Sequence, residues 1–361
     1  MEKKIYTKII GTGCCVPTKK VVNEDFMNNV FYDPTTGKPL EKENKEIIDK
    51  FYAITNIKER RWAEDDQVTS DLAVIAVKEA LADAKMDQED LEFIIFCHNF
   101  GDVAYGNSRM NVIPSLASML KYKMKIKNPF SVAHDVICGC PGWTQGMIVA
   151  DAYIRSGMYK RGVVIGADTI SRVSDPHDRD SMIYADGAGA TIVEAVESEE
   201  PVGIISHSSR NDGYPYADCL NFGKSFNPDY DQNELLLKMK GHKLYVYALR
   251  HVPTTVKDSI EKAGLQIEDI QKIFIHQANE KMDEAILTRL FGLYGEKEIP
   301  EKIMPMIISK LGNSSAATIP MLMDLLLKGK VGDHAVQKGS YSVFCSVGAG
   351  MAINSIVYKW I

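Results

Sequence analysis

One design of secondary structure occurs twice in this chain, and it restricts the possible fold more than any other feature. Residues 71–85 have helical apolar spacing and lead through a short link into the apolar run 92–97. Residues 244–263 have the same spacing and lead in the same way into the apolar run 272–275. Helices that alternate with short apolar runs are typical of α/β domains, in which helices cover both faces of a parallel sheet. We therefore predict an α/β fold built from two similar units.

This repeat also predicts where the chain divides. We expect an N-terminal half over residues 1–200 and a C-terminal half over residues 201–361, joined in the acidic link 194–201. With 361 residues, 45% of them apolar, the chain is long enough to bury a large core in both halves. Further strands are expected at residues 7–10, 162–166, 189–193 and 342–345.

Cys140 is the first candidate for a chemically active side chain. It lies in the run His-Asp-Val-Ile-Cys-Gly-Cys-Pro-Gly-Trp (residues 134–143), directly before the helical-looking residues 144–150. A sharp strand-to-helix turn here aims the sulfur at a helix N-terminus, where the dipole and free N–H groups favour the nucleophilic thiolate. The alternative is a buried structural cysteine, the commoner fate of a single Cys.

Three downstream stretches offer partners for that sulfur. His276 directly follows the apolar run 272–275, and a side chain at the C-terminal end of such a strand faces the usual ligand site of an α/β protein. Asn313 lies among small residues that permit close backbone approach to a ligand. Gly348 belongs to a glycine-rich turn between two apolar runs. Each has a structural alternative: a satisfied histidine at a strand end, a helix N-cap and an ordinary tight turn.

Taken together, these stretches and several others resemble one enzyme family. The resemblance is to the β-ketoacyl-ACP synthase III-like condensing enzymes of the thiolase superfamily, and it extends over nearly the whole chain. It implies a thiolase fold, with two duplicated α/β halves in a five-layered αβαβα arrangement, and it places Cys140 rather than Cys138 at the nucleophile position. The segments that carry it are residues 6–13, 55–61, 135–142, 166–168, 175–179, 184–190, 276–279 and 312–316.

The resemblance implies a role for each candidate residue. Cys140 takes an acyl chain from a thioester and holds it covalently, which divides one difficult exchange into two easier steps. His276 and Asn313 donate hydrogen bonds to the enolate that forms when a malonyl-type thioester loses carbon dioxide. The backbone amides of Cys140 and Gly348 form an oxyanion hole for the acyl carbonyl. The implied enzyme is a ketosynthase that condenses the acyl group on Cys140 with an ACP-bound malonyl or β-ketoacyl thioester.

Other functions stay open at this point. One synthase III-like subgroup, the dialkylresorcinol-forming ketosynthases, condenses two acyl thioesters and cyclises the product to a cyclohexanedione or dialkylresorcinol precursor. The same Cys, His and Asn side chains would also serve an acyl-thioester hydrolase or a non-condensing acyltransferase. A non-catalytic partner of a second ketosynthase fits less well, because such partners typically lack the nucleophile.

Several positions depart from the family pattern near the substrate entrance. Lys50 and Ile54 stand where the family has a tryptophan and an arginine that clasp the CoA nucleotide, which favours a carrier-borne acyl donor. Ile113 stands where a phenylalanine often limits acyl length, so a longer tunnel is expected. Residues 31–44 look inserted, and their Pro-Thr-Thr-Gly core predicts a surface hairpin or, alternatively, a flap over the pocket. Lys281 lies near the family's basic ACP-contact position.

Charge patterning bears on the possible partners. The net charge of −6 argues against general nucleic-acid binding. Lysines alternate in one short segment, which we interpret as a solvated strand face or loop, with a docking patch for acidic ACP as the alternative. These lysines are Lys121, Lys123, Lys125 and Lys127.

Cysteine usage and the lack of targeting signals favour a cytoplasmic protein. The seven cysteines show no framework spacing, which reduced thiols explain best, and none of their pairs has the spacing of a zinc site. We expect neither a metal nor another cofactor. The first residues lack the apolar stretch of a signal peptide, and no run approaches the roughly 18 apolar residues of a membrane helix. The family resemblance implies a homodimer.

Overall fold

Two β-sheets form the centre of the protein, in a computed structural model that describes residues 3–107, 109–231 and 233–361. All strands of the first sheet lie before Glu199, and all strands of the second lie after Pro201. The division into halves at residue 200 nevertheless stays a prediction. The first sheet has the order β1 (Lys4–Cys15), β7 (Asp186–Ser198), β6 (Arg161–Thr169), β4 (Phe93–His98) and β5 (Val132–Ile137). The second has the order β11 (Ile270–Ile275), β12 (Tyr341–Gly348), β13 (Ala352–Lys359) and β8 (Gly203–Asn211).

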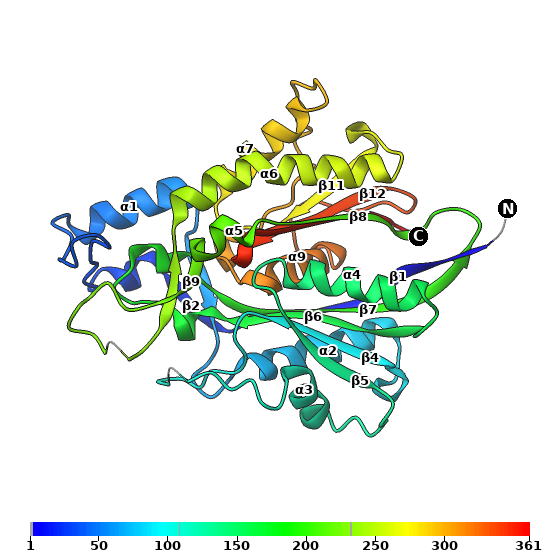
Figure 1. Ribbon diagram of the computed structural model, residues 1–361, viewed down its shortest axis with the longest axis horizontal. Helices are drawn as coiled ribbons and strands as arrows, with labels where there is room; N and C mark the ends of the chain where they lie inside the picture. Colours follow the sequence, from blue (N-terminus) through cyan, green and yellow to red (C-terminus); the bar gives the residue numbers. More distant parts are fainter. Residues whose placement is uncertain (1–2, 108, 232) are drawn as a thin grey trace.

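Helices lie between the two sheets and on both outer faces, which gives five layers (Figure 1). One pair packs between the sheets, a second pair covers the first sheet, and a third covers the second sheet. This arrangement confirms the predicted five-layered αβαβα fold. In that order the pairs are α4 (Gly142–Arg155) with α9 (Thr318–Leu327), α2 (Thr69–Ala84) with α3 (Leu116–Met124), and α6 (Gly241–Lys262) with α7 (Glu280–Gly292).

The strand directions differ from the sequence prediction. We expected parallel strands throughout, but both sheets are mixed. Only the pairs β4–β5, β4–β6 and β11–β12 are parallel. The pairs β1–β7, β6–β7, β12–β13 and β13–β8 are antiparallel. The physical reason is that β6 leads to β7, and β12 to β13, without a crossover helix, and such short connections join antiparallel strands.

Helix α9 of the central layer has almost no solvent-exposed face, because a sheet covers each side of the layer. Nearly every residue of α9 is buried, as expected for a helix without a solvent face. Gly166 of β6 permits the turn before this helix to approach the sheet closely, since a Cβ at that position would lie 2.1 Å from the backbone oxygen of Ala316. This contact fixes residues 313–317 against the first sheet, beside the start of α4.

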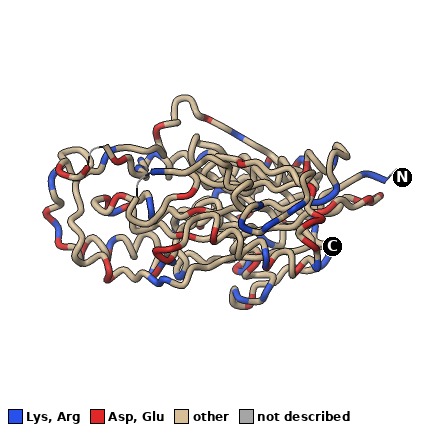
Figure 2. Tube along the Cα trace, turned by 90° about the horizontal axis from the view of Figure 1, so that it is seen from below, with Lys and Arg blue, Asp and Glu red and all other residues tan. Residues whose placement is uncertain are grey.

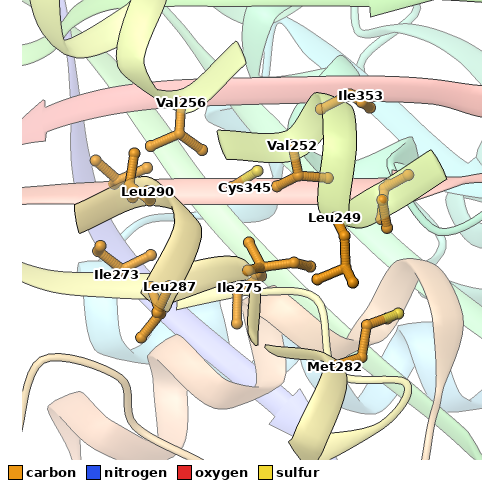
Figure 3. Close-up of a cluster of buried hydrophobic side chains, with 14 of the residues drawn as sticks. Leu249, Val252, Val256, Ile273, Ile275, Met282, Leu287, Leu290, Cys345 and Ile353 are labelled. Atoms are coloured by element: carbon orange, nitrogen blue, oxygen red, sulfur yellow. The ribbon is translucent and has the colours of Figure 1, made fainter. Parts of the chain in front are cut away.

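A second apolar cluster holds the outer helices on the second sheet. Leu249 and Val252 of α6 and Leu287 of α7 pack over Ile275 and Cys345 of the adjacent strands β11 and β12 (Figure 3). Replacing one such buried Leu or Ile by Ala costs about 2–5 kcal/mol in known cores. The cluster ends beside residue 276, so it anchors the strand end that carries the candidate histidine.

Short elements surround these layers at the end of the molecule that carries α1, far from both termini (Figure 1). Residues 31–44 form a hairpin-like turn, as predicted: Tyr32 pairs with Pro39, and the Leu40 N–H donates to the Phe31 oxygen. The short elements are β2 (Lys19–Val22), α1 (Asn44–Thr55), β3 (Glu59–Trp62), α5 (Gly213–Tyr216), β9 (Leu220–Gly223), β10 (Leu236–Met239) and α8 (Ile308–Leu311).

The alternating lysines lie partly in a helix, which the sequence analysis did not predict, and partly in a loop, which it did, since Lys127 follows the helix. Lys121 and Lys123 lie in the last turn of α3, and Lys125 ends that helix in a left-handed conformation. Lys121 donates to the backbone oxygens of residues 128 and 131, and Lys123 forms an ion pair with Asp71. These two cations therefore stabilise the local fold, which argues against a docking patch. Separately, none of the helices in the described part of the chain has the length and apolar character that a membrane span requires.

Candidate active site

Cys140 occupies the predicted strand-to-helix turn. Strand β5 ends at Ile137 and α4 begins at Gly142, so the sulfur-bearing residue lies just before the helix N-terminus. Gly139 has a φ of +54°, which favours glycine, and a Cβ there would lie 2.9 Å from the Cβ of Ala349. The N–H of Gly142 donates to the oxygen of Gly139 at 2.9 Å, which closes the turn.

The protonation state of this cysteine differs from the sequence expectation. Burial raises the pKa of the Cys140 thiol to about 12, although a hydrogen bond from the Ser315 hydroxyl acts in the opposite direction. At this pKa the resting sulfur is a thiol at neutral pH. Stabilisation of the thiolate must come from donors that act on it locally.

His276 lies at the C-terminal end of β11 and is 3% exposed. Its backbone N–H donates to the Cys345 oxygen at 2.8 Å, and the next side chain, that of Gln277, binds the backbone of residues 305, 307 and 308. Burial lowers the pKa of His276 to about 4, so the ring is neutral at neutral pH. Its Nδ1 has no hydrogen-bond partner in the described part of the chain. The site thus holds a rigid, uncharged imidazole.

Hydrogen bonds of its backbone and of its side-chain oxygen hold Asn313 in place. Its N–H donates to the Ile183 oxygen at 2.9 Å, and its own oxygen accepts from the Ala185 N–H at 2.8 Å. The side-chain Oδ1 accepts from the Ser315 N–H at 2.8 Å. This cap-like bond was the structural alternative for Asn313, and it also orients the amide so that its NH₂ group is left to donate.

Gly348 packs directly on the candidate nucleophile. A Cβ at this position would lie 2.7 Å from the Cβ of Cys140 and 3.0 Å from its backbone nitrogen. The turn after β12 therefore brings the backbone of residue 348 against that of residue 140. Glycine is required here for close approach.

The candidate residues line a small inner pocket of about 30 Å³. Cys140, His276, Asn313 and Gly348 all belong to its wall. Its other lining residues are Asn99, Ile170, Tyr184, Leu220, Leu237, Met239, Leu244, Ala278, Met282, Ser315 and Val347.

A larger outer pocket of about 550 Å³ adjoins the inner one, and the two share four lining residues: Met239, Leu244, Ala278 and Met282. Apolar side chains from α1 and α6 contribute to its wall, among them Ile47, Phe51 and Tyr245. A volume of this size is typical of small-molecule sites. The outer pocket therefore borders the pocket that contains the candidate residues.

The outer pocket carries charged groups among its apolar lining. Lys50, Ile54 and Lys281, which were singled out in the sequence, all line it. Lys42 and Arg179 of the same lining form ion pairs with acidic neighbours, whereas no ion pair of Lys50 or Lys281 is found among the described residues. Basic and acidic residues are otherwise mixed along the trace (Figure 2).

Ile113 does not widen an acyl tunnel within this chain. Its side chain is 84% exposed, and it lines neither pocket. The expectation of a longer tunnel at this position is therefore not met within the chain, because the residue lies on the surface of the chain. In the described part of the chain no group of three or more His, Cys, Asp or Glu side chains is arranged to hold a metal ion.

Sequence reasoning missed several polar residues of the site. Ser315 donates to the Cys140 sulfur at 3.4 Å, and Asn99 donates to Ser315 and to Asp168. The hydroxyl of Tyr184 is buried in the inner pocket and finds no partner among the described residues. One signal was available: Asn99 directly follows strand β4, as His276 follows β11.

Known proteins share the motifs and the fold. Residues 134–213 match the family model of 3-oxoacyl-[acyl-carrier-protein] synthase III, and residues 260–360 match the model of its C-terminal part. A β-ketoacyl-[acyl-carrier-protein] synthase III of Staphylococcus aureus is 35% identical over 309 residues, which cover 85% of this chain and 88% of that protein.

Two solved structures illustrate the similarity of the fold. The 3-oxoacyl-[acyl-carrier-protein] synthase III of Aquifex aeolicus aligns with a TM-score of 0.79 and 27% identity, covering 98% of this chain and all of that one. OleA of Xanthomonas campestris aligns with a TM-score of 0.76 over the full length of both chains, but at 16% identity it supports the fold alone. By its family models and its curated relatives, the chain belongs to the 3-oxoacyl-[acyl-carrier-protein] synthase III family of the thiolase superfamily and is a condensing acyltransferase, a ketosynthase.

Proposed function

We propose that Cys140 carries the acyl chain in this ketosynthase and that His276 and Asn313 assist the carbon–carbon bond formation. The strongest support is that the three side chains line the inner pocket, which adjoins the outer pocket. Cys140 follows a strand of the first sheet, and His276 and Asn313 lie between two strands of the second sheet. We further propose that residues 1–200 form the half that carries the nucleophile and residues 201–361 the half that carries the histidine and the asparagine.

In the first step the Cys140 thiolate attacks the carbonyl carbon of an acyl thioester. The C–S bond to Cys140 forms and the C–S bond to the donor breaks; the proton that Cys140 lost on becoming a thiolate ends on the departing sulfur, so the donor is released as a free thiol. The amides of Cys140 and Gly348 are the proposed donors to the tetrahedral oxyanion, because the two backbones are in close contact.

In the second step an ACP-bound malonyl or β-ketoacyl thioester supplies the carbon nucleophile. Where the extender is malonyl, carbon dioxide leaves and an enolate forms, with its charge on the thioester oxygen. A neutral imidazole and an amide NH₂ suit this charge, because both donate hydrogen bonds without an ion pair in the ground state. The enolate carbon attacks the acyl group, and the Cys140 thiolate is the leaving group.

The outer pocket supports a carrier-borne substrate. Lys281 and Lys50 offer cations without an ion-pair partner in the described chain, beside an apolar wall. An amphipathic acyl-phosphopantetheine on an acidic carrier protein has the complementary character, since its phosphate is anionic and its acyl arm is apolar. We therefore assign Lys281 to the docking of the carrier.

A homodimer in the cytoplasm completes the proposal. Strand β5 pairs only with β4 in the described chain, so its other edge has free backbone groups. Ile137 and the nearby Phe130 are 67% and 83% exposed. An exposed apolar edge strand is an unfavourable surface for a monomer, and pairing with a second copy would cover it.

The test is mass spectrometry of the protein after incubation with acyl thioesters. We expect an acyl adduct on the peptide that contains Cys140, no adduct in Cys140→Ala, and a 3-oxoacyl product when ACP-bound malonyl thioester is added. Normal turnover by Cys140→Ala without an adduct would refute the proposal. Release of free acid alone would instead identify a hydrolase.

A further inference from the structure

A chain of directed hydrogen bonds ends on the sulfur of Cys140. The Oγ of Ser315 donates to Sγ at 3.4 Å, although the two residues are 175 positions apart. The Nδ2 of Asn99 donates to this Oγ at 2.7 Å and to Oδ2 of Asp168 at 2.7 Å. Asp168 also accepts from the backbone N–H groups of Asn99, at 2.8 Å, and Ala316, at 3.2 Å.

The direction of each bond follows from the chemistry of Asp168. An ionised carboxylate only accepts hydrogen bonds, so it selects the NH₂ end of the Asn99 amide. One hydrogen of that group goes to Asp168, and the other goes to Ser315. Because the serine oxygen already accepts from Asn99, its own hydrogen is directed to the sulfur.

Asp168 is suited to fix this direction. It is 1% exposed, and no Lys or Arg forms an ion pair with it in the described part of the chain. Burial raises its pKa to about 6, while its backbone and side-chain donors oppose that rise, so the carboxylate is ionised at neutral pH. N–H donors and the nearby His98 stabilise its charge, and two of those donors come from Asn99.

The backbone at Ser315 gives independent support. Its φ is +53°, in the left-handed region that non-glycine residues rarely adopt. The N–H of Ser315 donates to Oδ1 of Asn313, and the following N–H donates to Asp168. Strained residues of this kind persist where the surrounding contacts enforce them, and they concentrate at functional sites. Here the unusual backbone places the serine hydroxyl on the sulfur.

We propose that Ser315 is a further catalytic residue, whose hydroxyl donates to the Cys140 thiolate, and that Asn99 and Asp168 are positioning residues that direct this hydroxyl. This inference rests on the proposed role of Cys140 as nucleophile. Ser315 supplies a local hydrogen-bond donor to a buried sulfur, and its hydroxyl lies 3.4 Å from that atom.

The test is the rate of Cys140 alkylation by iodoacetamide over a pH series, followed by mass spectrometry that separates Cys140 from Cys138. In Ser315→Ala and Ser315→Gly we expect the thiolate pKa to rise by about one unit, which slows alkylation about tenfold at each pH below that value. Both variants enlarge the pocket, so easier access would instead speed the reaction. They differ in backbone strain, so an equal shift in both is due to the hydroxyl.

Ser314→Ala is the matched control. Ser314 is also buried, at 3% exposed, but its hydroxyl lies near Thr318 and Met321 rather than Cys140. We expect its alkylation profile to coincide with that of the wild type. Thermal unfolding of every variant shows whether a change in rate accompanies a loss of structure.

Asn99→Ala tests the positioning role. Its profile should shift in the same direction as that of Ser315→Ala, and the shift of the double variant should be smaller than the sum of the two single shifts, because Asn99 directs the hydroxyl that Ser315→Ala removes. Fully additive shifts would show that Asn99 does not act through Ser315. A wild-type profile in folded Ser315→Ala would overturn the catalytic role of Ser315. Either result leaves the acyl adduct on wild-type Cys140 intact, so the proposed function is tested separately.

Discussion

Gly348 lies so close to Cys140 that a Cβ on the glycine would stand 2.7 Å from the Cβ of the cysteine. The contact also involves the ring of Pro141, whose Cδ would be 2.7 Å from the same atom. Neither neighbour is the end of a flexible side chain, so a substitution at residue 348 must move the backbone of the nucleophile turn. The position is therefore a sensitive probe of the site.

Gly348→Ala is expected to slow formation of the Cys140 acyl adduct by about 10²-fold, the usual effect of displacing a reacting group by about 1 Å. The measurement is the rate of adduct formation by mass spectrometry at fixed acyl-thioester concentration. Gly292→Ala is the control, because a Cβ at Gly292 has no heavy atom within 4 Å. Equal rates in both variants would show that the turn tolerates the displacement.

The sequence predicted the three candidate residues because each has a local signal. Cys140 precedes a helix, His276 ends an apolar run, and Asn313 lies among small residues. The hydrogen bond from Asn99 to Ser315 was not predicted, because 216 positions separate the two residues and only the fold brings them together. The chain of hydrogen bonds that ends on Cys140 is a tertiary feature without a sequence pattern.

Strand positions were predicted better than strand directions. Every expected run overlaps an observed strand, because apolar β-forming residues are a local signal. Direction depends instead on how strands connect, and the sheets are mixed where no helix intervenes. The pKa of Cys140 could not be predicted in the same way: the turn is a local feature, whereas the burial that raises the pKa depends on the tertiary fold.

The pKa of His276 predicts how stability depends on pH. The unfolded chain binds a proton near the ordinary pKa of 6.5, whereas the folded ring binds it only near 4. Between these values the unfolded state holds more protons, so stability falls as the pH falls, by up to roughly 3 kcal/mol. The raised pKa of Asp168 acts in the opposite direction over part of this range.

His276→Gln isolates the contribution of the imidazole. We expect urea unfolding to show a smaller loss of stability in this variant than in the wild type between neutral pH and about pH 5. His207→Gln replaces an exposed histidine of β8 and serves as control, with the wild-type pH dependence. A wild-type dependence in His276→Gln as well would mean that the buried ring does not resist protonation.

Lys281→Glu is expected to weaken acyl transfer from ACP more than from a short acyl thioester without a carrier. The exposed cation at the pocket wall contacts the acidic carrier in the proposed complex, so reversing its charge slows association, and most strongly at low salt. The measurement is adduct formation with both donors at two salt concentrations. Lys297→Glu changes the same charge outside the pocket lining. Equal losses of rate with both acyl donors would indicate that Lys281 contributes to folding or to the chemical step and not to docking of the carrier.

A buried ion pair behind the pocket should be essential for stability. Asp175 is fully buried and accepts from Lys238 of β10, from the Ser225 hydroxyl and from the Phe226 N–H. Burial tends to raise the pKa of Asp175, but Lys238 and the backbone N–H groups of His177 and Phe226 hold it below its ordinary value.

Lys238→Met leaves the Asp175 carboxylate buried without its cation, which typically costs about 3–5 kcal/mol. Lys240→Met removes an exposed partner of Asp218 and should cost about 1 kcal/mol or less. Urea unfolding at neutral pH measures both changes. Similar small losses would indicate that water or backbone movement compensates the buried charge.

Ile137→Lys tests the edge of β5 as the contact between two copies of the chain. The side chain is 67% exposed on a strand that has a partner on one side only in the described chain. A lysine disfavours edge-to-edge pairing, because it brings two like charges together across the contact and they lose hydration. Sedimentation at micromolar concentration should show a dimer for the wild type and a monomer for the variant. Tyr214→Lys, at a side chain of α5 that is 95% exposed, should remain dimeric. A dimer in both variants would move the interface away from β5, and a wild-type monomer would remove the homodimer altogether.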